Sequence, residues 1–126
     1  MSMATESVNY REIEKRLFET FPQLTAAYQR EFSYWVDWDK ERPGTYLVFA
    51  TVVVPYLIAQ LDEPGDGQAL VRLFAFFEEM AASNDPEVIN LLKSEVVRTL
   101  VRDPTHLAKA QDHLGQRVRD LLPTVQ

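Results

Sequence analysis

The sequence predicts an all-α protein of about six antiparallel helices, folded as a single domain over residues 1–126. Apolar residues recur every three or four positions through most of the chain, as they do on the buried face of an amphipathic helix. The stretches between these segments are short and rich in Asp, Asn, Pro and Gly, which start and stop helices. Short connections place consecutive helices side by side in opposite directions.

Composition limits the classes of function. The chain has 126 residues, 46% of them hydrophobic and 25% charged, which is typical of one soluble domain. A formal net charge of -6 argues against nonspecific nucleic-acid binding, which requires cations that neutralise phosphates. With no cysteine, disulfides, thiol catalysis and cysteine-ligated metals are excluded. No secretory signal pattern precedes the first charged residues, so we expect a cytoplasmic protein that does not act at a membrane.

The first two helices are expected to begin at capping boxes. Asn9 is followed three residues later by Glu12, and this pair predicts a first helix that continues to about residue 21. Thr20 and Gln23 form a second such pair around a proline, which is favoured in a first helical turn. The apolar spacing then predicts a second helix that ends near Trp35.

The apolar run 46–61 is ambiguous between strand and helix. Its first nine residues are rich in β-branched and aromatic side chains, which favours a strand. Sixteen residues without a turn signal are long for a strand, and apolar residues on every side are typical of a buried central helix. We favour a helix with a kink near Pro55. A membrane span needs about twenty apolar residues, and this run is shorter.

Three further helices are predicted after the turn at residues 62–67. Asp66 is a suitable cap for a helix that extends to about residue 82. Asp85-Pro86 and Asp103-Pro104 each place a capping carboxylate before a proline at the first helical position. The last helix is predicted to run without a break to Leu121. Successive Asp-Pro openings suit both an irregular bundle and a short HEAT-like stack of helical hairpins, and the choice stays open.

The negative charge is concentrated in the middle of the chain. Residues 31–92 contain eleven acids and three bases, a net charge of -8, whereas residues 93–126 carry +2. Turn chemistry and helix dipoles alone would place many of these acids at loops and helix starts. The alternative is an acidic face that attracts a basic partner.

Aromatic and acidic residues alternate between Phe32 and Asp39. Trp35 continues the apolar stripe of its helix, whereas Tyr34 and Trp38 lie off that stripe. They are either interface anchors, a role in which Trp and Tyr are enriched, or, for Trp38, a cover over the core. Together with acids of the middle segment they give the following candidate partner-binding set: Tyr34, Asp37, Trp38, Asp39, Glu41, Glu78, Glu79 and Glu87.

No arrangement of residues predicts catalysis, a metal or a cofactor. His106 and His113 are seven residues apart, which separates them by about 10 Å along a helix, too far to share one ion. We expect both to be surface residues of an amphipathic helix. The sequence has neither a nucleophile elbow around a serine nor the lysine and glycine spacing of a phosphate loop.

Part of the chain resembles a group of small bacterial helical proteins. The resemblance lies in the segments 73–80 and 84–92, in Pro55-Tyr56-Leu57, and in the pairs Leu114-Gly115 and Leu121-Leu122. Similar small acidic proteins are immunity proteins that neutralise antibacterial toxins. Phe-Glu before a capped turn also resembles one unit of a HEAT-type repeat, although Asn90 stands where such repeats often carry arginine. The resemblance covers about residues 45–122 and transfers no functional residue.

These observations lead us to expect a noncatalytic binding protein, an immunity protein that inhibits a basic toxin domain. Its acids and aromatic anchors would occupy a basic cleft on that toxin. The alternative is a helical scaffold or adaptor between proteins. The mark of an adaptor would be an exposed apolar groove between helices rather than an acidic surface.

Overall fold

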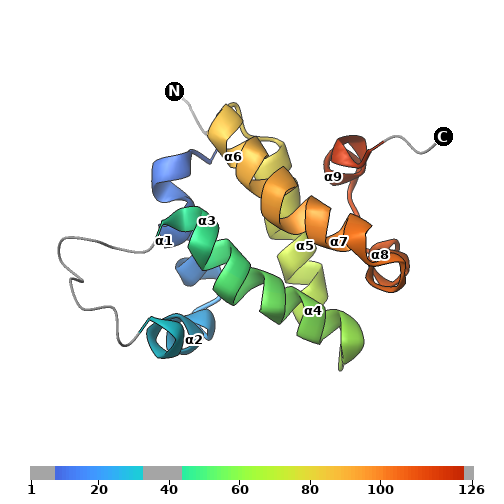
Figure 1. Ribbon diagram of the computed structural model, residues 1–126, viewed down its shortest axis with the longest axis horizontal. Helices are drawn as coiled ribbons and strands as arrows, with labels where there is room; N and C mark the ends of the chain where they lie inside the picture. The colour runs from blue at the N-terminus through green and yellow to red at the C-terminus, as the bar shows by residue number, and fades with distance from the viewer. Residues whose placement is uncertain (1–7, 33–43, 124–126) are drawn as a thin grey trace.

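The computed structural model describes residues 8–32 and 44–123, and every regular element within these ranges is helical (Figure 1). The predicted all-α fold class is therefore confirmed. Two long helices, at 45–62 and 86–102, lie side by side on one side of the molecule. The helix between them in sequence, α5 (Gln68–Ala81), passes behind both and contacts each of them.

The N-terminal segment consists of the 3-10 turn η1 (Tyr10–Glu12), α1 (Ile13–Thr20) and α2 (Leu24–Glu31). The predicted cap at Asn9 is confirmed, because its side-chain oxygen accepts from the Glu12 N–H at 3.1 Å. The second predicted capping box does not form. Thr20 stays within α1, and Gln23 Nε2 donates instead to the Tyr56 hydroxyl at 3.0 Å.

The ambiguous segment is a helix, formed by α3 (Thr45–Val48), the π-helical turn η2 (Phe49–Val53) and α4 (Val54–Asp62). The π turn ends two residues before Pro55, which has no N–H for the normal helical bond. By length and composition this helix could cross a membrane. One of its faces nevertheless lies in the core, with these buried residues: Val48, Phe49, Val52, Val53, Leu57 and Leu61.

The predicted cap at Asp85 is confirmed, whereas the N-cap of α5 is Gly67, one residue after the predicted Asp66. Asp66 accepts from the Gln68 N–H at 3.0 Å where α5 begins. Asp85 accepts from the Glu87 N–H at 3.0 Å at the start of the second long helix. That helix comprises α6 (Pro86–Leu91), the π-helical turn η3 (Leu92–Val97) and α7 (Arg98–Arg102).

The last predicted helix is divided in two by a turn. It comprises α8 (Pro104–Ala110) and α9 (Gln116–Leu121), and residues 111–115 between them are not helical. Asp103 caps α8 as predicted, accepting from the Thr105 N–H at 3.0 Å. At the break, Arg119 donates to the backbone carbonyls of Gln111 and Leu114, at 2.6 and 3.2 Å. These bonds satisfy carbonyls that an unbroken helix would satisfy itself.

The core lies where α5 meets the two long helices and α1. Its largest fully buried side chains are Phe21, Phe49 and Phe77. Ring pairs such as Phe21–Phe76, 6.0 Å between centroids and edge-to-face, connect α5 with the end of α1. The helices are thus held by packing around α5, and α9 is attached to α5 and η3 at the edge.

Candidate functional site

Most of the predicted partner-binding set lies outside the described residues. Tyr34, Asp37, Trp38, Asp39 and Glu41 belong to the range 33–43. The remaining three acids, Glu78, Glu79 and Glu87, are described, and the structure does not bring them together into one set of free carboxylates.

Glu78 binds the start of α9. Its half-buried carboxylate accepts from the backbone N–H groups of Arg117 and Val118, at 3.2 and 2.9 Å. A carboxylate in this position satisfies helical N–H groups and complements the helix dipole. Gly115 makes the approach possible, because a Cβ there would overlap the Glu78 carboxylate. Glu78 therefore has a role in the fold, and its place in a partner surface stays a prediction.

Glu79 and Glu87 are exposed but differ in their contacts. The Glu79 carboxylate pairs with Arg16 at 2.7 Å and so joins α5 to α1. Glu87 lies in the first turn of α6. Burial raises the pKa of the Tyr46 phenol, and the negative charge of Glu87 raises that pKa further.

Both histidines make specific contacts. His106 is half-buried, and its Nε2 and Nδ1 lie 3.1 Å from carboxylate oxygens of Asp62 and Asp103. Lys109 donates to the same oxygen of Asp62 at 3.1 Å. His113 is stacked on the Phe74 ring, with 5.7 Å between centroids. The expectation of plain surface histidines was incomplete, because His106 joins the end of α4 to the start of α8.

At least two grooves open on the described surface. The smaller, about 170 Å³, lies between α1 and α5. Its two cations are engaged, since Arg16 pairs with Glu79 while Arg72 donates to the Thr20 carbonyl and lies 5.3 Å from the Phe21 ring centroid. Within the described ranges, no three His, Asp or Glu side chains form a metal-binding group.

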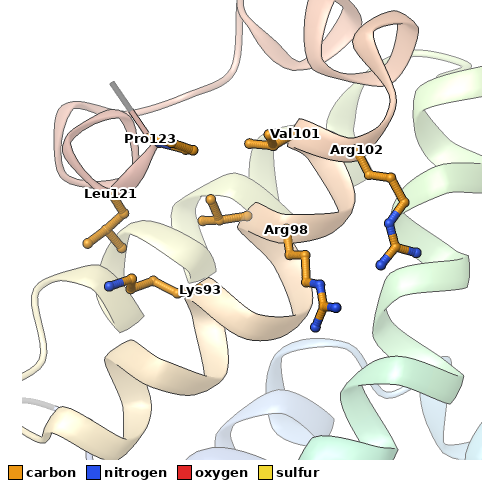
Figure 2. Close-up of a pocket in the computed structure, with 7 residues that line it drawn as sticks. Lys93, Arg98, Val101, Arg102, Leu121 and Pro123 are labelled. Carbon is orange, nitrogen blue, oxygen red and sulfur yellow. The ribbon is translucent and has the colours of Figure 1, made fainter. Parts of the chain in front are cut away.

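The larger groove, about 520 Å³, lies between η3–α7 and the end of α9. Val97 forms a buried part of its wall, and Val101 is 37% exposed, one of the few large apolar residues at the surface. Figure 2 shows the Val101 side chain directed toward Pro123, with Leu121 beside Lys93 at the other end. A volume of this size is typical of ligand-binding pockets. We define the "α7–α9 groove" by its lining: Lys93, Val97, Arg98, Val101, Arg102, Leu121 and Pro123.

Three cations border the α7–α9 groove. Arg98 and Arg102 extend to the same side, away from α9 and toward α4, whereas Lys93 lies at the α9 side (Figure 2). All three are exposed. Across residues 8–32 and 44–123, none of the three side chains makes a hydrogen bond or an ion pair. This site is not among the residues predicted from the sequence, although Val97 and Val101 follow directly after core positions Val96 and Leu100 and so lie off the main stripe.

The α7–α9 groove depends on α9 being held in place. Leu121 and Pro123 reach it only because α9 packs on α5 and η3. Val118 is fully buried in that contact, and the Glu78 carboxylate fixes the first turn. The bond from Glu78 to α9 therefore maintains one wall of the groove.

Comparison with known proteins gives a family and no function. No curated protein and no solved structure matches the chain. A family model described as a domain of unknown function, DUF7674, matches residues 14–122, so the chain belongs to that family.

Proposed function

We propose that this protein is a noncatalytic binding domain of the adaptor type, which holds a protein partner in the α7–α9 groove. The observation that carries the proposal is an exposed apolar groove between helices, the feature expected of an adaptor. The partner would place an apolar side chain against Val97 and Val101, between the wall of α9 and the two arginines. Anchors in concave apolar sites supply most of the energy in protein interfaces.

The chemistry of the lining supports binding rather than turnover. It consists of Val, Leu, Pro, Lys and Arg side chains, which include no hydroxyl, thiol, imidazole or carboxylate. Of the groups that acid–base and nucleophilic catalysis usually use, the described lining holds one, the Lys93 amine, with no second such group beside it. The lysine and arginines suit electrostatic recognition of a partner.

Toxin inhibition is a second candidate, favoured by the net charge of -8 over residues 31–92. In that case the contact would use the acids and aromatics predicted from the sequence, Asp37, Trp38 and Asp39 above all, on a basic toxin domain. A cytoplasmic location suits either candidate and likewise stays a prediction.

The adaptor proposal is tested by crosslinking in the native cells. A photoreactive phenylalanine analogue is placed at Val101, within the groove, or at Val71, an equally apolar residue of α5 that is 55% exposed outside it. We expect a single protein adduct from position 101 and none from position 71. Identical adducts from both positions, or none from position 101, would contradict the proposal.

The two candidates predict different sensitive residues. If the groove binds the partner, Val101→Asp abolishes the complex, and Asp37→Asn with Asp39→Asn leaves it intact. If an acidic surface inhibits a toxin, the results are reversed. Isothermal titration of these variants with the partner identified by crosslinking separates the two cases.

A further inference from the structure

The surface of η3 and α7 has an amphipathic pattern that identifies the chemistry of its partner. Val97 and Val101, one helical turn apart, both line the groove. The Val101 side chain is directed toward Pro123, at the end of α9 (Figure 2). Arg98 and Arg102 lie one residue further on and flank this apolar strip on the side toward α4. Lys93 adds a positive charge on the α9 side of the groove, beside Leu121 (Figure 2). A ligand on this strip meets an apolar floor and positive charge at its edges.

Resting on the proposed function, we propose that the occupant of the α7–α9 groove is an acidic amphipathic helix of a partner protein. Its apolar residues would pack on Val97 and Val101, and its carboxylates would pair with Arg98 and Arg102. Arginine binds carboxylates through paired hydrogen bonds, which gives both affinity and orientation. The only charged residues of the described lining are three cations, which favours an acidic ligand although the whole chain is acidic.

The spacing of the two arginines matches a helical ligand. Residues four apart on a helix have Cβ atoms about 5–6 Å from each other. Acids at positions i and i+4 of the ligand therefore face Arg98 and Arg102 at the same separation. At the helical rise of about 1.5 Å per residue, the groove wall from Lys93 to Arg102 is about 14 Å long. This length accommodates between two and three turns of a ligand helix.

An extended peptide suits the groove less well. Extended ligands are held by main-chain bonds to the open edge of a sheet or, for proline-rich segments, in grooves lined by aromatic rings. The described residues contain no strand, and the described lining of this groove contains no aromatic ring. A helix satisfies its own backbone and needs only a groove for its apolar face.

A membrane and a second copy of the chain are weaker candidates. The whole protein has a net charge of -6. An anionic bilayer would therefore be attracted only by the basic strip and repelled by the rest of the protein. The strip is also recessed beside α9, whereas a bilayer needs a protruding contact. A second copy has no described segment that we can match to the pattern of apolar residues and paired acids.

The inference is tested with a displayed library of 16-residue helical peptides, selected on the full chain. The Val101→Asp variant is the counter-selection target, and Val71→Asp is the matched control. We expect enriched peptides with apolar residues at i and i+4 and with acids one turn apart beside them. A chosen peptide should lose at least tenfold in affinity when its acids become glutamines. It should perturb amide resonances of residues 93–102 and 121–123 in nuclear magnetic resonance spectra.

Charge reversal makes the test specific. Arg98→Glu with Arg102→Glu should reverse the preference, so that the same peptide with lysines in place of its acids binds more tightly than the original. Enrichment of basic peptides, or no change in preference on reversal, would overturn the inference. So would loss of a dimer in sedimentation on Val101→Asp, or binding of vesicles of 30% phosphatidylserine in phosphatidylcholine without peptide selection.

The two proposals fail in different ways. If crosslinking at position 101 captures a partner whose contact segment is basic or not helical, this inference fails while the adaptor proposal stands. If position 101 captures nothing and no peptide is selected, both fail.

Discussion

The end of α5 and the outer surface of α7 carry charges of opposite sign and use them differently. On α5, Glu78 bonds to the first turn of α9 and Glu79 pairs with Arg16, so both acids connect parts of the fold. On α7, Arg98 and Arg102 have no such contact with any described residue and lie beside an open groove. The sign of the net charge therefore does not tell which charges are available to a partner.

The largest loss of stability is expected from a substitution at Gly115, which tests whether Glu78 holds the fold together. In Gly115→Ala the new methyl group overlaps the Glu78 carboxylate, which must shift from its position at the start of α9. Losing hydrogen bonds to a charged, half-buried group should lower the free energy of unfolding by about 2 kcal/mol. Denaturation in urea measures the change.

Gly44→Ala is the matched control, because a Cβ there meets no atom within 4 Å. Its effect should stay within about 0.5 kcal/mol. Equal stability of the two variants would show that the contact between Glu78 and α9 contributes little to the fold.

Much of the fold is predictable from sequence because its signals are local. The caps at Asn9, Asp85 and Asp103 act within three residues, and the apolar stripes repeat within one turn. The break between α8 and α9 is not predictable in this way. It is stabilised by Glu78, which is about forty positions away in the chain, and by the long side chain of Arg119.

The candidate site was harder to predict than the fold. The acidic composition led to a predicted site made largely of acids. Glu78 and Glu79, however, contact residues that are distant in sequence, so their roles in the fold are visible only in the structure. The groove did leave a signal, namely Val97 and Val101 next to the core stripe with Arg98 and Arg102 beside them. Without α9 folded against η3, that signal is an ordinary exposed helix face.

A second test concerns the contact between α4 and α8, which is formed by Asp62 with His106 and Lys109. Hydrogen bonds from Lys109 and His106 lower the pKa of the Asp62 carboxyl below its usual value of 3.8. Because the folded-state pKa is the lower one, the ionised carboxylate stabilises the fold above the unfolded-state pKa. That stabilisation is lost as the pH falls through the folded-state pKa.

The wild type should therefore lose stability more steeply below about pH 4 than Asp62→Asn does. Urea denaturation between pH 3 and pH 7 measures both curves. Asp112→Asn, which removes an exposed acid from the turn after α8, serves as the control and should follow the wild type. Parallel curves for the wild type and Asp62→Asn would exclude a stabilising role for this contact.

A smaller effect is expected for the pair between Arg16 and Glu79. The two side chains are 40% and 53% exposed, so solvent and salt screen their attraction. A double-mutant cycle with Arg16→Ala and Glu79→Ala should give a coupling energy of about 0.5 kcal/mol, smaller still at high salt. A coupling near zero at low salt would place Glu79 among the free acids and weaken the contrast with α7.

The smallest change in stability is expected from substitution of Arg98 and Arg102, the two arginines assigned to binding. Arg98→Gln with Arg102→Gln removes two cations that have no partner among the described residues, and it keeps the inner part of each side chain and a polar end. The free energy of unfolding should change by no more than about 0.5 kcal/mol, because no contact that holds the fold is lost. If the same variant also loses its affinity for the selected peptide, the two arginines act in binding and not in folding. A large loss of stability would instead show that these cations hold the fold, as the acids of α5 do, and the difference between the two regions would disappear.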